Sequence, residues 1–147
     1  MIYPSNFETK IQFSEIRSLL KGYCLSQLGK DKVDTMAFSD DAEQINMALR
    51  QTREFRRMQE EADDFPLQFF FDMRASIKRI RIEGTHLEEN EIFDLRRSLE
   101  TIAGIVRFLN RSDDEGNFDY PTLHSLTDDV LTFPDLIRRI DQILDKY

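Results

Sequence analysis

The sequence predicts an all-α fold, a multi-helix bundle of about six or seven helices, and three observations support it. The 147 residues include only five glycines and four prolines, about half the usual share of these helix breakers. Charged residues make up 33% of the chain, as in proteins built from long helices. Apolar residues also recur at spacings of three and four. The most regular of these patterns predicts one long heptad-patterned helix at about 88–110.

Size, charge and cysteine content exclude several classes of protein. A chain of 147 residues is the size of one domain, which we place at 1–147. The net charge of −8 argues against a surface given over wholly to nucleic acid, although it allows a local basic patch. Cys24 is the only cysteine, so the chain has no internal disulfide framework and no multi-cysteine zinc site. Without a membrane span or a signal peptide, a cytoplasmic location with no membrane partner is expected.

Serine residues predict the starts of the first three helical segments. Ser5 and Glu8 have the spacing of a capping box, and Ser14 and Ser26 each precede a helical pattern. The apolar positions of the second and third segments are Ile16, Leu19, Leu20 and Tyr23, then Leu28, Val33 and Met36. Each set shares one side of a helix.

A long helix is expected next. Ser39, Asp40 and Asp41 supply a cap and negative charge at its start, where the helix dipole favours both. Its expected inner face consists of Ile45, Ala48, Leu49, Thr52, Phe55 and Met58. The helix should end before Pro66, because proline pushes its predecessor out of helical geometry.

The middle of the chain predicts a connector and a short helix. Residues 67–71 are apolar and aromatic, which indicates a buried, extended connector. Asp72 then caps a helix from Met73 to about Ile82, which Gly84 stops.

The long heptad helix carries the strongest periodic signal. Steps of three and four, repeated in alternation, join the apolar residues Ile92, Leu95, Leu99, Ile102, Val106 and Leu109. This is the a/d pattern of a coiled-coil seam. An acidic loop containing Gly116 follows over residues 112–119.

Two further helices should begin at Pro121 and Pro134, since proline is tolerated in a first turn. The last helix places Leu136, Ile140, Ile143 and Tyr147 on one side. It has no stop signal, so we expect it to continue to the last residue as part of a longer protein.

The sequence offers no convincing catalytic or metal-binding set. His86 and His124 stand alone, and Cys24 has no histidine partner, so packing or solvent-facing roles are favoured for all three. Gly29-Lys30 fails as a phosphate loop, because Asp31 stands where a hydroxyl residue is required. Clusters of acidic residues, such as Glu60-Glu61, are best explained as solvated charge.

A three-residue pattern near the first helix invites a specific function. Phe13-Ser14-Glu15 has the Phe-x-Glu form with which mismatch-binding proteins wedge a ring beside a base. Phe13 also lies one turn before Ile16, so helix packing explains it more simply.

One basic cluster stands out as a candidate nucleic-acid contact. Arg74, Lys78 and Arg81 fall at i, i+4 and i+7 of the predicted helix, with Arg79 beside them. Such a stripe could follow a phosphate backbone. The alternative is a set of ion pairs with the acidic residues at 60–64. Weaker candidates, diluted by neighbouring acids, are Arg53, Arg56, Arg57, Arg96 and Arg97.

Motifs spread along the whole chain resemble the amino-terminal region of the bacterial MutS-two family, the recombination-suppressing paralogues of mismatch-repair MutS. The matching stretches are Phe13-Ser14-Glu15-Ile16 with Leu19-Leu20, Ser26-Gln27-Leu28-Gly29-Lys30, Gln51-Thr52-Arg53-Glu54, Asp72-Met73-Arg74 followed by Ile77, Arg79, Gly84 and Leu87, Glu91-Ile92-Phe93-Asp94-Leu95, and Ile140-Asp141. The most specific is the Asp72 element, which resembles the family's Asp-Ile-Arg-x-x-Leu. Family members often carry glycine shortly before that element, where this chain has Phe69-Phe70-Phe71.

The resemblance implies a role that the residues alone do not show. It implies an all-helical segment that precedes the clamp helices, an ATPase that uses ATP and Mg²⁺ and dimerises, and usually a nuclease-linked Smr domain. Family proteins are implicated in binding branched DNA to suppress recombination and in splitting stalled ribosomes. The mismatch-reading domain is absent from the family, which also argues against a wedge at Phe13.

The sequence therefore supports two hypotheses of different kinds. In the first, the chain is a non-catalytic connector of a MutS-type ATPase, and Arg74, Lys78, Arg79 and Arg81 contact nucleic acid. In the second, it is a protein-interaction scaffold that binds a partner helix on the heptad face and has no nucleic-acid role. An enzyme with an unrecognised site is the third and weakest hypothesis.

Overall fold

The computed structural model describes residues 6–144, and these fold entirely with helices as their regular structure. The α-helices are α1 (Phe7–Lys10), α2 (Phe13–Tyr23), α3 (Gln27–Asp34), α4 (Ala42–Glu61), α5 (Arg74–Arg79), α6 (Glu89–Leu109), α7 (Pro121–His124) and α8 (Pro134–Ile143), with a 3₁₀ turn, η1, at Ser125–Thr127. Within the described residues, β-structure is limited to one isolated bridge between Ser112 and Phe118. The all-α prediction is confirmed, and the helices outnumber the expectation because α1 and α7 are single turns.

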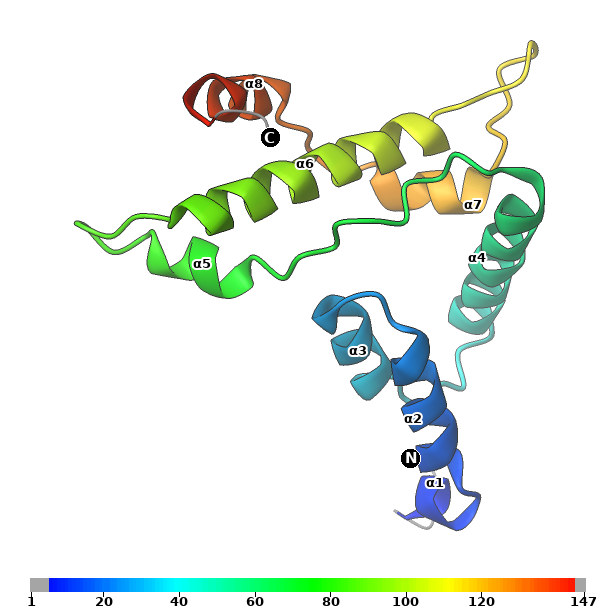
Figure 1. Cartoon of the computed structure of the whole chain (residues 1–147). Helices are drawn as coiled ribbons and strands as arrows, with labels where there is room; N and C mark the ends of the chain where they lie inside the picture. Colours follow the sequence, from blue (N-terminus) through cyan, green and yellow to red (C-terminus); the bar gives the residue numbers. More distant parts are fainter. Residues whose placement is uncertain (1–5, 145–147) are drawn as a thin grey trace.

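The long heptad helix α6 has α7 and α8 beside it, whereas α1, α2 and α3 lie away from it (Figure 1). Helix α6 packs on α7 and α8, and α4 packs on α7. Helices α1, α2 and α3 form a separate packed group at the start of the chain, which the 36–41 segment joins to α4. No helix of the described part is long and apolar enough to cross a membrane.

The core lies where α4, α6 and α7 meet. Met58 is fully buried there, and Phe108, Leu109, Tyr120 and Leu123 are at most 7% exposed. Aromatic rings fill much of this volume: Phe65 makes edge-to-face contacts with both Phe55 and Phe108.

Glu54 connects α4 to the start of α7. Its two carboxylate oxygens accept hydrogen bonds from the backbone N–H groups of Thr122 and Leu123, at 3.1 and 2.8 Å. These amides have no partner within their own helix, and the helix dipole favours a negative charge at this end. Glu54 thus caps a helix 68 residues farther along the chain.

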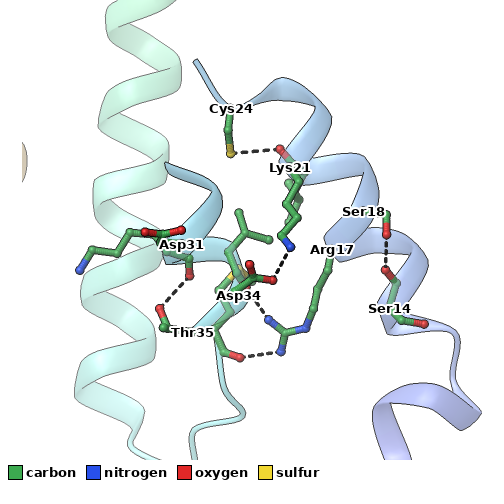
Figure 2. Close-up of polar contacts among 12 residues, drawn as sticks. Ser14, Arg17, Ser18, Lys21, Cys24, Asp31, Asp34 and Thr35 are labelled. Atoms are coloured by element: carbon green, nitrogen blue, oxygen red, sulfur yellow. Dashed lines mark hydrogen bonds and ion pairs between the residues drawn. The ribbon is translucent and has the colours of Figure 1, made fainter. Parts of the chain in front are cut away.

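Arg17 connects the first three helices, and Figure 2 shows its contacts with the end of α3. Its guanidinium donates to the backbone carbonyls of Val33 and Met36, at 2.6 and 2.5 Å, and pairs with the Glu8 carboxylate at 2.8 Å. The side chain is only 16% exposed. Lys21, one turn along α2, adds an ion pair to Asp34 at 2.5 Å. Polar contacts from one face of α2 therefore hold the end of α3.

Most predicted helix starts are confirmed, but Ser14 does not start α2: the helix begins at Phe13, and Gln12 is its N-cap residue. Ser26 accepts a hydrogen bond from the Gly29 N–H. Asp41 accepts from the N–H groups of Glu43 and Gln44. Glu88 and Glu91 form a capping box at the start of α6. Pro121 and Pro134 occupy first turns as expected. The proposed Ser5 cap lies outside the described residues.

Three expectations about burial and helix length are wrong. The first half of the inner face of α4 is open, with Ile45 and Leu49 more than 40% exposed, because α7 covers only the second half. The 67–71 connector is extended but not buried, with Leu67 44% exposed. Helix α8 ends at Ile143, and Leu144, which was expected to be helical, is extended; residues 145–147 lie outside the described part. Tyr147 lies outside the described residues.

The triple phenylalanine stretch adopts an uncommon backbone conformation. Phe69 has a φ of +63°, in the left-handed region that glycine adopts more easily. The chain thus places a phenylalanine on a glycine-like turn just before α5. Thr101 of α6 donates to the neighbouring Gln68 carbonyl at 2.9 Å, which fixes the connector to the long helix.

Candidate nucleic-acid interface

Helix α5 carries the predicted basic stripe and is shorter than expected. It spans Arg74–Arg79, and Ile80 is its C-cap. A turn that ends at Gly84, with a φ of +82°, follows. Arg81 therefore lies in that turn and not on a continuous helical face with Arg74, although its backbone N–H still donates to the Lys78 carbonyl.

Arg74 is held by two carboxylates. Its guanidinium donates to Asp72 at 2.5 and 2.7 Å and to Asp31 of α3 at 2.6 Å. The hydrogen bond from Arg74 lowers the pKa of Asp72 from 3.8 to about 2. The same guanidinium, followed by Gln27, lowers the pKa of Asp31. The positive charge of Arg74 is therefore already neutralised, and its pair with Asp31 joins α5 to the N-terminal helices.

Arg79 is also engaged, with the start of α6. It pairs with the Glu91 carboxylate and donates to the His86 carbonyl. Ser76 donates to the other oxygen of Glu91 at 2.7 Å. This bond lowers the pKa of Glu91 to about 2, with help from the Glu88 N–H and from Arg79. Arg79 therefore fastens α5 beside the amino-terminal end of α6 (Figure 1).

Lys78 and Arg81 differ from the two arginines that flank them. Both side chains are exposed, and neither has an ion-pair partner within the described residues. They lie one turn apart, so they can face the same ligand. Of the four predicted contact residues, these two are exposed without an ion-pair partner among the described residues, whereas Arg74 and Arg79 are engaged by carboxylates.

The alternative explanation of the stripe named the wrong acidic partners. The acidic residues at 60–64 do not reach α5: Glu60 and Glu61 pair with arginines on their own helix, and Asp64 pairs with Arg111. The partners of the stripe are instead Asp31, Asp72 and Glu91. Ion pairing is therefore correct for half of the stripe, with different carboxylates.

The weaker basic candidates mostly have structural contacts. Arg56 pairs with Glu60, and Arg57 lies over the Tyr120 ring and pairs with Glu61. Arg96, with its side chain 18% exposed, pairs with Asp141 of α8 at 2.5 Å. Arg97 lies over the Phe69 ring. Arg53 is exposed on α4.

The histidines and the cysteine have ordinary surroundings. His124 stacks on Phe118 and shares a hydrogen bond with Asn110 at 2.9 Å. His86 is 79% exposed in its side chain. Cys24 is half-buried, and its thiol contacts the Leu20 carbonyl. Among residues 6–144, no group of three histidine, cysteine or acidic side chains is placed to hold a metal ion.

Sequence reasoning missed the contacts that join distant segments. No local sequence pattern predicts three of these contacts: those of Arg17 with α3, the cap of Glu54 on α7, and the pair between Asp31 and Arg74. Only Glu54 had a signal, because it closes the Gln-Thr-Arg-Glu motif that resembled the family.

Comparison with known proteins gives a consistent result. The chain is 25% identical over 130 residues to Endonuclease MutS2 of Latilactobacillus sakei, and 27% identical over 130 residues to that of Bacillus cereus. It is 24% identical over 137 residues to Endonuclease MutS2 of a Geobacillus species. These matches cover 88%, 88% and 93% of the chain, respectively.

The chain spans only 16–17% of the length of these relatives. No family model matches the chain, and no solved structure matches it. The similarity to MutS2 proteins nevertheless runs through nearly all of the sequence, as the motif resemblance predicted. These relatives support the interpretation of the chain as a MutS2-family region.

Proposed function

We propose that this chain is a non-catalytic helical connector, corresponding to the amino-terminal region of a MutS-type protein, and that it contacts nucleic acid through Lys78 and Arg81. The observation that carries the proposal is the state of the α5 stripe. Arg74 and Arg79 are locked to carboxylates, while Lys78 and Arg81 between and beyond them remain exposed and uncompensated. A short helix and the turn after it, which carry two cations without an ion-pair partner among the described residues, suit a phosphate backbone.

The proposed function of the whole protein is based on the motif resemblance to the MutS-two family and on the names of the relatives. Those relatives are named endonucleases. In a longer MutS-type chain, ATP and Mg²⁺ would bind an ATPase domain beyond residues 1–147, and that domain would mediate the homodimer. Branched DNA or a stalled ribosome would be the target, in the cytoplasm. The chain itself would couple the nucleotide state of the ATPase to the part of the protein that binds nucleic acid.

Two attachments explain how the helices could transmit a displacement. Arg74 connects α5 to α3 through Asp31, and Arg79 connects α5 to α6 through Glu91. A force on Lys78 or Arg81 therefore reaches both the N-terminal helices and the long helix. We assign Arg74 and Arg79 as positioning residues and Lys78 and Arg81 as contact residues.

The test is the affinity of the 147-residue chain for a fluorescent four-way DNA junction. At about 0.1 M salt, the double variant Lys78→Glu/Arg81→Glu should weaken binding by on the order of tenfold for each phosphate interaction that it removes. The matched control is Arg138→Glu/Arg139→Glu on α8, which makes the same change in net charge at two exposed positions. The control should bind almost as tightly as the unmodified chain.

Two results would contradict the proposal. One is an equal decrease of affinity in both double variants, since the effect would then be general charge. The other is failure of the unmodified chain to bind either the junction or purified ribosomes. Binding to ribosomes alone, abolished in the α5 variant but not in the α8 variant, would keep Lys78 and Arg81 as contacts and identify ribosomal RNA as the target.

A further inference from the structure

An open apolar groove lies beside the carboxy-terminal half of the heptad helix. It has a volume of about 430 Å³. Its lining comes from α4, the 62–73 connector, α6, and the segment from α7 to Val130, and comprises Phe55, Phe65, Ile102, Ile105, Val106, Leu109, Leu123, Leu126, Thr127 and Val130. Leu126 is 57% exposed, and Ile102 and Val130 are each 39% exposed. The groove is thus an accessible apolar surface over the protein core.

The chemistry of the lining argues against a small-molecule ligand. Metabolite sites contain a few convergent polar groups that fix the ligand's orientation. Thr127 is the only polar residue of this lining, and its hydroxyl already donates to the His124 carbonyl at 2.7 Å. A polar metabolite would find no hydrogen-bond partner in the groove, whereas the apolar side chains of a protein partner need none.

The geometry of the lining suits a helix. Ile102, Val106 and Leu109 are the last three positions of the heptad seam. Side chains at this spacing form the holes into which the apolar side chains of a second helix pack. Ile102 is the most exposed position of the seam at 39%, whereas Val106 is half-buried like Ile92, Leu95 and Leu99, and Leu109 is buried. Of the seam residues that line the groove, Ile102 is therefore the one most available to a partner.

The charges next to the groove favour a basic partner. Asp128 and Asp129 are exposed and lie between the lining residues Thr127 and Val130. The Asp128 carboxylate lies 4.0 Å from the imidazole of His124. No lining residue is charged. A helix seated in the groove with lysine or arginine along its edge would meet these two carboxylates.

We propose that this groove is a docking site for a basic amphipathic helix of a partner protein. The apolar face of that helix packs on Ile102, Val106 and Leu126, and its basic edge pairs with Asp128 and Asp129. The site is distinct from the α5 surface, so it does not depend on the proposed contact with nucleic acid. It assigns the heptad face a specific ligand, a helix with one apolar face and a basic edge.

The experiment measures the binding of labelled model helices to the 147-residue chain by fluorescence anisotropy. The probe is a peptide of about 18 residues with leucine at heptad a and d positions and lysine at e and g positions. A second peptide has glutamate at the e and g positions, and a third has the lysine composition in scrambled order. The lysine peptide should bind roughly threefold to tenfold more tightly than the glutamate peptide, and the scrambled peptide should not bind.

Variants of the chain locate the site. Ile102→Glu and Leu126→Glu should each abolish binding, and because both side chains are partly exposed, the fold should survive, as checked by circular dichroism. Ile143→Glu on α8 is the matched control, since Ile143 is 79% exposed outside the groove, and it should bind normally. In Asp128→Asn/Asp129→Asn, the lysine and glutamate peptides should bind with similar affinity, because the apolar contacts remain and the charge contacts are lost.

Three outcomes would overturn the proposal. Equal binding of the lysine and glutamate peptides would remove the charge argument. Unchanged binding in both groove variants would place the peptide elsewhere. Concentration-dependent dimerisation of the chain that Ile102→Glu abolishes would show that a second copy, and not a basic helix, fills the groove.

Discussion

Replacing Arg17 by alanine should destabilise the first three helices more than any other surface arginine replacement. The guanidinium donates to two carbonyls, of Val33 and Met36, and pairs with Glu8. At 16% side-chain exposure it is largely removed from solvent. Its removal leaves both carbonyls and the Glu8 carboxylate without that partner at once.

The magnitude follows from the separate contacts. Hydrogen bonds to a charged donor contribute about 1.5–3 kcal/mol each, and the Glu8 pair, with a carboxylate 44% exposed, adds at most about 1 kcal/mol. Contacts made by one side chain do not add fully. We therefore expect a decrease in stability of about 3 kcal/mol, or about 6–12 °C in Tm for a chain of this size. Arg17→Lys should recover less than half, because an ammonium lacks the fork geometry.

Urea titration followed by circular dichroism measures this decrease, and hydrogen exchange locates it. Exchange should accelerate in α3 before it changes in the Met58 core, because Arg17 contacts only the N-terminal helices. The control is Arg56→Ala, whose side chain is 81% exposed in an i,i+4 pair and should cost about 0.3–0.5 kcal/mol. If Arg17→Ala costs no more than the control, the reasoning about Arg17 is refuted.

Three further predictions test other parts of the fold. Met58→Ala, at a fully buried position, should cost about 2–5 kcal/mol in urea unfolding, and a cost under about 1 kcal/mol would contradict the assigned core. Glu54→Ala should cost about 1–2 kcal/mol and speed exchange of the Leu123 amide, whereas unchanged exchange there would exclude the cap. The folded pKa of Glu91 is about 2 against an ordinary 4.5, so its stabilising contribution is complete above about pH 4.5 and disappears as the pH falls towards 2. Asp72 acts in the same direction, and in urea titrations from pH 7 to pH 2 the Glu91→Gln variant should decline less than the unmodified chain.

The sequence predicted the local features well, because their signals are local. The Ser26 and Asp41 caps act within three residues of themselves, and the boundaries of the heptad helix at 88–110 match α6 closely. Pro121 and Pro134 fixed two helix starts for the same reason. In each case the deciding interaction joins residues within one turn of helix.

The periodic pattern could not show which apolar faces are covered. The spacing of Ile45 and Leu49 matches that of Phe55 and Met58, yet only the second pair is covered, since α7 reaches only the second half of α4. Periodicity reports which side of a helix is apolar, not whether another element packs there. The open groove at Ile102 was hidden from the sequence for the same reason.

The sequence identified the basic residues of the candidate contact site, but it did not show which of them are neutralised by carboxylates. The sequence placed all four basic residues on one helix, whereas Arg74, Lys78 and Arg79 lie on α5 and Arg81 lies in the turn after it. Which of them are neutralised depends on Asp31, which lies 43 residues before Arg74, and on Glu91, which lies 12 residues after Arg79. The pairs with Asp31 and Glu91 form only in the folded chain, and sequence reasoning chose the acids at 60–64 instead.

The central claim, that Lys78 and Arg81 contact phosphate while Arg74 and Arg79 hold the helix, is tested most directly by the salt dependence of junction binding. Each phosphate contact contributes about 0.9 to the slope of log affinity against log salt concentration. The account predicts that Lys78→Glu/Arg81→Glu makes this slope shallower by about 1.8 than that of the unmodified chain. An unchanged slope would contradict it.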